Sequence, residues 1–222
     1  MKSYFFKPQF YKSYIRPILF SVPPEFSQKL ADIILEKKLF QQLVSNSLTI
    51  NNPQLATEFV GIKLNNPVGL AAGYDKNCKH IKALEKLGFS YLVCGTIINN
   101  PRYGNPKPRI LRLPKDNALI NSLGFPSEGL NQIIHNLDKN KTHNNPIILS
   151  ISGLNIDEIL NCYRQLETYA DAFEINISSP NTKGLKLFQD YKILKELFIK
   201  LNKIRKKPII VKIPPYTNTK NT

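Results

Sequence analysis

Five short, continuously apolar runs separated by stretches with helical spacing restrict the fold of this chain more than any other feature. The runs are PVGLAAG (67–73), YLVCGTI (91–97), IILSIS (147–152), AFEINIS (172–178) and PIIVKIP (208–214). A strand that is apolar on both faces has to be covered on both faces, as in parallel sheets whose strands are connected by helices. The sequence therefore predicts a repeating βα unit.

The stretches between these runs have the spacing of amphipathic helices. In residues 75–88, Ile81, Leu84 and Leu87 share one helical face, Asp75 is suited to be the N-cap and Gly88 to end the helix. Similar helical patterns fill residues 127–137, 156–169 and 189–206, while residues 107–123 alternate like a pair of strands.

Five βα units in succession favour a barrel over an open sheet, because the GxGxxG fingerprint of a nucleotide-binding open sheet is absent from the sequence. We therefore expect an α/β protein of the (β/α)8 TIM-barrel type. The 222 residues hold about five of its βα units, so the barrel is expected to be incomplete.

The first part of the chain predicts a helical extension. Residues 24–43, PEFSQKLADIILEKKLFQQL, place apolar side chains at helical spacing with lysines among them, and a shorter apolar and basic stretch precedes them. We expect residues 1–45 to form this extension and residues 46–222 the partial barrel. A basic amphipathic helix can lie on a membrane surface, and a helical cap packed on the main domain is the alternative.

The composition excludes several classes of function. Lys and Arg exceed Asp and Glu by 31 to 16, a net charge of +15, which suits nucleic acid, an anionic membrane or an acidic small molecule. Basic residues interleaved with stacking aromatics are missing, so we expect no nucleic-acid partner. The three cysteines form no CxxC pair and the three histidines no HExxH motif, which predicts free thiols and no metal site.

Polar residues follow the apolar runs, where a barrel enzyme carries its chemistry. They are Tyr74-Asp75-Lys76, Thr96, residues 178–181 and Lys212. Lys76 is expected at a helix start, where the helix dipole disfavours a cation, and Lys212 inside an apolar strand, where a lysine is costly unless paired. Both positions favour a bound anion.

The stretch EINISSPNTKGL (174–185) carries the strongest functional signal. Strand alternation puts Glu174, Asn176 and Ser178 on one side, and Pro180 holds Ser179 extended at the rim. A rigid hydroxyl beside carboxamides suits a planar ligand with amide groups, because Asn both donates and accepts. A turn rich in Ser, Pro and Asn for loop reasons alone is the other interpretation.

Five segments resemble the ordered landmarks of the dihydroorotate dehydrogenase family. The segments are NPVGLAAGYDKN, GNPKPRILRLP, INSLGF, INISSPNTKGL and PIIVKIPP. The resemblance implies oxidation of dihydroorotate to orotate in de novo pyrimidine (UMP) biosynthesis, with FMN as cofactor. Ser179 at the base position and the helical extension resemble the membrane-associated class, which passes electrons to ubiquinone or menaquinone. That class implies a peripheral membrane protein, on the cytoplasmic face of a bacterial inner membrane or on the mitochondrial inner membrane.

The resemblance also assigns roles to residues at matching positions. Ser179 would take the proton from C5 of dihydroorotate, with Thr182 and Phe125 in the proton-relay pocket. The residues implied to contact the substrate are Lys76, Asn121, Gly124, Phe125, Asn176 and Asn181. Those implied to contact FMN are Ala72, Gly73, Lys76, Thr96, Asn176 and Lys212. Arg112 would lie on the quinone side.

Three departures keep other functions open. The resemblance implies a C-terminal truncation, because about three βα units, with the loops that bind the FMN phosphate, do not follow Lys212. The third strand, LSISGLN, lacks an asparagine usual in the quinone class and is closer to the soluble class, and Pro126 replaces an asparagine. The alternatives are a soluble-class enzyme that uses fumarate or NAD, and an inactive fragment or one that needs a partner chain.

Overall fold

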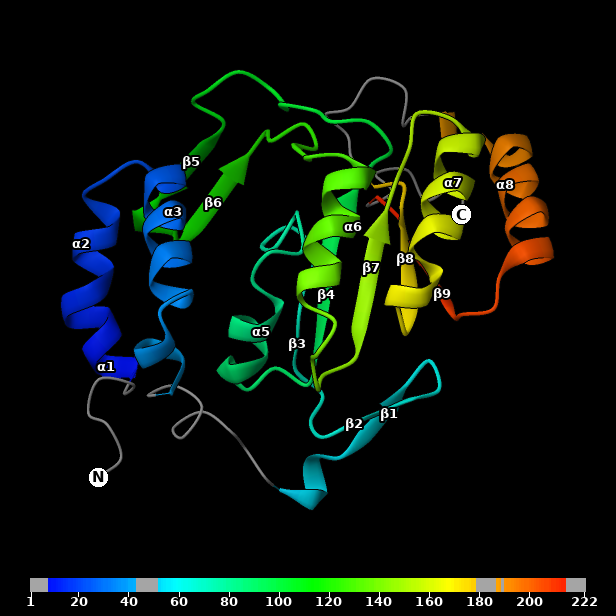
Figure 1. Ribbon diagram of the computed structural model, residues 1–222. Helices are drawn as coiled ribbons and strands as arrows, with labels where there is room; N and C mark the ends of the chain where they lie inside the picture. The colour runs from blue at the N-terminus through cyan, green and yellow to red at the C-terminus, as the bar shows by residue number, and fades with distance from the viewer. Residues whose placement is uncertain (1–7, 43–51, 179–186, 189, 215–222) are drawn as a thin grey trace.

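Strands and helices alternate along the computed structural model, which describes residues 8–42, 52–178, 187–188 and 190–214. Five parallel strands form the central sheet in the order β3-β4-β7-β8-β9 (Figure 1). Their bounds are β3 (Gly69–Leu70), β4 (Tyr91–Ile97), β7 (Ile147–Ile151), β8 (Ala172–Asn176) and β9 (Ile209–Lys212). Order in the sheet follows order in the chain, as in a barrel and unlike an open sheet wound in two directions. The predicted α/β fold with part of a barrel is confirmed.

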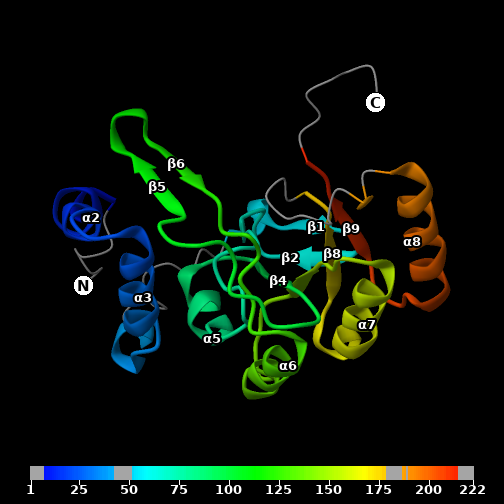
Figure 2. The same cartoon turned by 90° about the horizontal axis from the view of Figure 1, so that it is seen from above.

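Helices cover the outer side of this sheet, and Figure 2 shows them on an arc around the strands. They are α5 (Ile81–Leu84), α6 (Leu130–Lys139), α7 (Ile156–Leu166) and α8 (Tyr191–Ile204). Their fully buried side chains, such as Ile133, Ile159 and Leu197, pack in one cluster with Leu149 and Phe173 of the strands. Predicted helices and strands agree with these elements to within a few residues, apart from the differences below.

The inner side of the sheet changes from apolar to polar along the strands. At its lower end Val93, Ile148 and Ala172 form a second buried cluster. One step further along, Ser150 of β7 pairs with Glu174 of β8, and at the upper end Asn176 pairs with Lys212 of β9. The parallel register therefore brings polar side chains together at the carboxyl ends of the strands.

Two antiparallel hairpins lie at opposite ends of the sheet (Figure 1). The lower hairpin, β1 (Thr57–Phe59) and β2 (Ile62–Leu64), packs Val60 and Ile62 against the inner apolar cluster. The sequence does not predict this hairpin, because its turn has Val60 at φ 49°, where an asparagine or glycine would indicate a hairpin. The upper hairpin, β5 (Ile110–Leu113) and β6 (Ala118–Asn121), is the strand pair predicted in residues 107–123.

Helical segments precede the barrel units and stand beside β5 and β6 (Figure 1). They are α1 (Pro8–Phe10), a π-helical stretch η2 (Tyr11–Ile15), α2 (Arg16–Phe20) and α3 (Pro24–Leu35). The helix predicted over residues 24–43 ends at Leu35, and residues 38–42 are helical again. The predicted division of the chain at residue 45 falls outside the described residues and stays a prediction.

Short 3-10 helices complete the structure, and one of them changes a prediction. They are η3 (Pro53–Leu55), η4 (Glu85–Leu87), η5 (Pro114–Asp116) and η6 (Glu167–Tyr169). The helix predicted from Asp75 begins only at Ile81, so Asp75 is not its N-cap. The Asp75 carboxylate instead accepts the main-chain N–H groups of Lys79 and His80, both at 2.8 Å, which stabilises a turn. Lys76 consequently lies in this turn and not at a helix start.

We expect Tyr163→Phe to lower the free energy of unfolding by about 1 kcal/mol, because it leaves two partly buried main-chain donors without their acceptor. The buried Tyr163 hydroxyl accepts the main-chain N–H groups of Lys206 at 2.8 Å and Lys207 at 3.2 Å, which ties α7 to the segment before β9. Urea unfolding of both proteins measures the difference. Tyr169→Phe is the matched control, since that hydroxyl donates to the exposed Asp138 and its loss should change little. Equal effects of the two substitutions would contradict the assignment.

Candidate functional site

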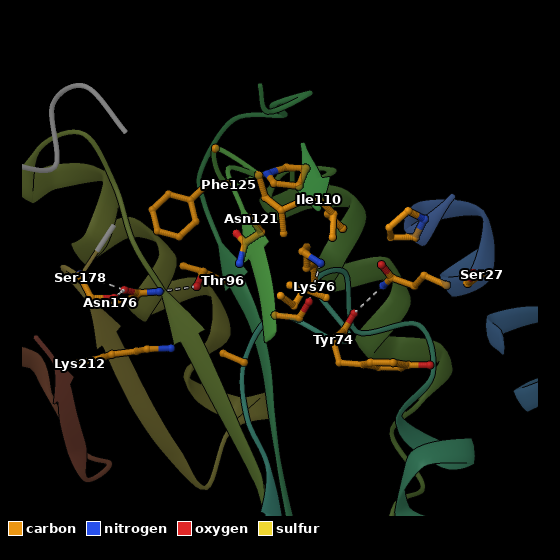
Figure 3. Close-up of a pocket in the computed structure, with 18 of the residues that line it drawn as sticks. Ser27, Tyr74, Lys76, Thr96, Ile110, Asn121, Phe125, Asn176, Ser178 and Lys212 are labelled. Atoms are coloured by element: carbon orange, nitrogen blue, oxygen red, sulfur yellow. Dashed lines mark hydrogen bonds between the residues drawn. The ribbon is translucent and has the colours of Figure 1, made fainter. Parts of the chain in front are cut away.

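A pocket of about 730 Å³ opens at the carboxyl ends of the strands (Figure 3). Ten residues predicted from the sequence line it together: Ala72, Gly73, Lys76, Thr96, Arg112, Asn121, Gly124, Phe125, Asn176 and Lys212. Tyr74 and Ser178, polar residues that follow predicted strands, line the pocket as well, and so do Pro24, Ser27, Gln28, Ile110, Leu119, Leu123 and Pro126, for which the sequence indicates no role. The predicted Ser179, Asn181 and Thr182 lie outside the described residues.

Asn176 at the end of β8 is fixed by hydrogen bonds on both sides of its carboxamide. Its Nδ2 donates to Thr96 Oγ1 at 2.8 Å, and its Oδ1 accepts from the main-chain N–H of Ser178 at 3.1 Å and from the Ser178 hydroxyl at 2.7 Å. A main-chain N–H can only donate, so the amide orientation is determined. One N–H of Nδ2 remains for a ligand.

The main-chain conformation of Gly95 places Thr96 at the pocket. Its φ is 119°, and a Cβ there would lie 2.4 Å from the main-chain oxygen of Ser150, so only glycine fits. The Gly95 main-chain groups bind the turn after β3: its N–H donates to Asp75 O and its carbonyl accepts from Gly73 N–H. Strand β4 and the turn that carries Lys76 are thereby held together.

Lys76 places a half-buried ammonium at the pocket. Burial lowers its pKa from the ordinary value of 10.5, the nearby Arg109 guanidinium lowers it further, and Asp32, Asp75 and Glu25 partly offset this. Its Nζ donates to the main-chain carbonyl of Gly73. A bound anion would stabilise the charged form of Lys76. The prediction of an anionic ligand therefore rests on the burial of the Lys76 ammonium, because Lys76 does not lie at a helix start.

The prediction that Lys212 lies in a buried, apolar environment is wrong. The side chain was expected inside an apolar strand, but it is exposed, because β9 is the edge of the sheet in the part of the chain that the structure describes. Its ammonium points into the same space as the Asn176 carboxamide (Figure 3). The Lys212 ammonium is therefore available to a ligand, and its charge is not desolvated in the folded protein.

Gly124 and Phe125, which follow β6, form another part of the pocket wall. Both residues are left-handed, with φ of 70° and 54°. This conformation is uncommon for a bulky side chain and often marks a functional position. It turns the Phe125 ring toward the pocket, near Asn121 at the end of β6 (Figure 3).

Arg112 of β5 attaches the helical extension to this wall. Its Nη1 donates to the main-chain carbonyls of Leu19 at 3.0 Å and Val22 at 2.9 Å, and its Nη2 donates to Ser27 Oγ at 2.9 Å. Its guanidinium also lies 4.5 Å from the centre of the Phe20 ring. Arg112 thus binds one carbonyl in the last turn of α2 and one just after this helix, where main-chain carbonyls lack helical partners.

Two further contacts join α3 to the pocket. Glu25 forms an ion pair with Arg109 at 2.9 Å, and Gln28 Nε2 donates to the main-chain oxygen of Tyr74 at 3.4 Å. Burial, followed by Asp32, raises the pKa of the Tyr74 hydroxyl to about 12, so this phenol stays neutral at physiological pH. The helical extension therefore forms one side of the pocket.

Comparisons with known proteins agree on one family. The family model described as Dihydroorotate dehydrogenase matches residues 54–222. A dihydroorotate dehydrogenase (quinone) of Thermus thermophilus is 34% identical over 210 residues, which are 89% of this chain and 61% of that relative. One from Acinetobacter baumannii is 38% identical over 197 residues, 83% of this chain and 56% of the relative. The chain thus spans about 60% of the length of these curated relatives.

Solved structures give the same result. A ligand-free DHODH from Eimeria tenella superposes with a TM-score of 0.71 at 29% identity, over 86% of this chain and 63% of that one. The complex of DHODH from Eimeria tenella with ferulenol gives a TM-score of 0.69 at 29% identity, over 88% and 62%.

We expect Arg112→Lys to loosen α2 and α3, because a lysine cannot reproduce the planar fork that reaches three acceptors. Hydrogen exchange of the α2 and α3 amides should become about ten-fold faster, as for a loss of roughly 1.4 kcal/mol. Arg164→Lys on the exposed face of α7 is the control and should leave these amides unchanged. Unaltered exchange in Arg112→Lys would remove Arg112 as the attachment.

The Lys76 ammonium should titrate below 10.5, because burial disfavours its charged form. The folded chain then releases this proton at lower pH than the unfolded chain, so its contribution to the free energy of unfolding grows as the pH rises toward 10.5. NMR titration of the ¹³C-dimethylated protein measures the midpoint, and Lys76→Arg assigns the signal. A midpoint at or above the ordinary value would contradict the burial argument.

Proposed function

This chain belongs to the dihydroorotate dehydrogenase family, and from this we propose that it supplies much of the active site of a quinone-linked enzyme that oxidises dihydroorotate to orotate in pyrimidine biosynthesis. The observation that carries the proposal is that ten predicted residues, from several strands and the segments that follow them, line one pocket. A cation, carboxamides and an aromatic wall around one cavity suit a planar, anionic pyrimidine.

The pocket also has the chemistry to hold FMN, which we propose as the cofactor. Ala72 and Gly73 present a low wall, and a Cβ built on Gly73 would meet no atom within 4 Å, so the main chain borders open space. Thr96, Asn176 and Lys212 offer hydrogen-bonding groups and positive charge for the oxygen and nitrogen atoms of a flavin ring. When bound, FMN would accept the hydride from C6 of dihydroorotate and supply the electrons that reduce a quinone.

The side chains of this chain would bind and orient the substrate. Lys76 would pair with the substrate carboxylate, and the carboxamides of Asn121 and Asn176 would hydrogen-bond to its ring amides. Phe125 would cover the ring and exclude water. From the sequence resemblance, Ser179 would take the proton at C5, with Thr182 in its relay and Asn181 as a further contact.

We further propose that the helical extension forms the quinone side and rests on a membrane surface. Pro24, Ser27 and Gln28 of α3 line the same pocket as Arg112. Apolar side chains on the helical segments are exposed, among them Tyr14, Ile18, Phe26, Ile33 and Leu39. In the part of the chain that the structure describes, no helix has the length and apolar character needed to cross a bilayer. A peripheral position, at a bacterial inner membrane or a mitochondrial one, is part of the proposal.

Two alternatives predict different behaviour. A soluble-class enzyme, suggested by the segment LSISGLN in the third strand, would pass electrons to fumarate or NAD, whereas the relatives named for quinone favour a quinone. A fragment without its FMN phosphate site, or one that needs a partner chain, would not bind the cofactor by itself.

The test is the visible spectrum of the purified protein that carries this chain, loaded with FMN and titrated anaerobically with dihydroorotate. We expect the flavin absorbance to bleach and a quinone to restore it. Restoration by fumarate or NAD in place of a quinone would favour the soluble class. A protein that stays colourless after FMN is added would support the fragment.

Lys76→Met should raise KM for dihydroorotate roughly ten- to hundred-fold, because the substrate carboxylate loses a charged hydrogen-bond donor. Lys79→Met is the matched control: Lys79 lies on the same turn, is exposed and pairs with Glu128 away from the strand ends. We expect its steady-state kinetics to equal those of the unmodified protein. Equal KM values for the two variants would contradict the role of Lys76.

A further inference from the structure

A chain of hydrogen bonds crosses the inner side of the sheet below the pocket. Ser150 Oγ donates to Glu174 Oε1 at 2.7 Å, Ser150 Oγ lies 3.0 Å from Thr96 Oγ1, and Thr96 Oγ1 accepts from Asn176 Nδ2 at 2.8 Å. Ser150 and Thr96 are buried, with 0% and 6% of their surface exposed, so water does not compete readily for these groups. The parallel register of β7 and β8 creates the chain by placing Ser150 opposite Glu174.

The direction of every proton in this chain follows from the carboxylate. A carboxylate only accepts, so the single hydroxyl proton of Ser150 is used on Glu174. Thr96 must then donate to Ser150, and its remaining lone pairs accept from Asn176. The carboxamide is left with its nitrogen toward Thr96 and its oxygen toward Ser178, which is the orientation that the Ser178 N–H also requires.

We infer that Glu174 is a positioning residue, which acts through Ser150 and Thr96 to fix the Asn176 carboxamide with its free N–H toward the bound ligand. Glu174 occupies the inner side of β8 between buried Ala172, at the lower apolar end, and Asn176 at the pocket. A half-buried carboxylate at this height stabilises the strands less than an apolar side chain would, since its desolvation is unfavourable. The direction that Glu174 gives to these hydrogen bonds is a reason for a carboxylate at this position.

The expected effect on the binding of dihydroorotate and FMN rests on the proposed function. The direction of the hydrogen bonds does not depend on it. If Glu174 loses its carboxylate, Ser150 is free to donate to Thr96. Thr96 then favours an acceptor, whereas the Ser178 N–H still requires the carboxamide oxygen on its own side. The Thr96 hydroxyl can then also donate toward Asn176, which competes with the carboxamide orientation that the Ser178 N–H requires, so the free N–H of Asn176 is held less firmly in one direction.

The experiment compares Ser150→Ala and Glu174→Leu with Ser152→Ala in the full protein. Ser152 is the matched control, because it follows the last residue of β7, is 0% exposed and donates to the main-chain oxygen of Asn176 and not to its carboxamide, at 2.8 Å. The first readout is the ¹H–¹⁵N signal of the Asn176 side-chain amide without ligand, and the second is FMN affinity and KM for dihydroorotate.

We expect Ser150→Ala and Glu174→Leu to shift or broaden the Asn176 amide signal and to weaken FMN or dihydroorotate binding about ten-fold, the range of one charged hydrogen bond. The double variant should be no worse than either single one, because both interrupt the same chain. Glu174→Gln keeps a carbonyl acceptor and should restore most of the affinity. Ser152→Ala should leave the amide signal and both binding constants unchanged.

Other results separate the two proposals. An Asn176 amide signal that is unmoved in Ser150→Ala and Glu174→Leu, or moved equally in Ser152→Ala, would overturn the positioning role. Fully additive effects in the double variant would overturn it as well. If the amide responds as expected while the unmodified protein neither binds FMN nor oxidises dihydroorotate, the proposed function is wrong and the positioning of Asn176 by Glu174 is supported.

Discussion

Burial of β4 on both faces is the constraint on which the rest of the structure depends. The strand pairs with β3 on one side and β7 on the other, and all its residues after Tyr91 are buried. Along its buried length this strand has little room for chemistry, so polar function is confined to its carboxyl end, where Thr96 follows Gly95. Strands β7 and β8 are buried along nearly their whole length as well, and the polar ends of the strands meet there because all five are parallel.

The sequence predicts much of this fold because two physical signals are local. Apolar runs identify β4, β7 and β8, and helical periodicity identifies α6, α7 and α8. The same signals fail where competing local structures share a pattern. Asp75 suits a helix N-cap and a turn equally well, and the structure uses it in the turn. Lys212 shows the other limit, since the exposure of a strand depends on what lies beside it.

Some residues of the candidate site are predictable from the sequence and others are not. Residues near the carboxyl end of a strand, such as Thr96 within β4 and Lys76 in the turn after β3, are predictable because the barrel rule specifies their place. Ser27 and Gln28 are not, because they reach the pocket from a helix far away in sequence, through contacts that no periodicity encodes. The link between Ser150 and Glu174 needs the register of two strands, which the sequence pattern leaves undetermined.

Arg112 recognises the helical extension mainly through the main-chain carbonyls of Leu19 and Val22. Every residue type offers such a carbonyl, so most substitutions at these two positions preserve the contact. Positions 19 and 22 are therefore free to diverge in sequence while the extension keeps this contact with the barrel. Outward side chains of these helices can change without altering the pocket, and similarity among relatives should fall faster in the helices than at the strand ends.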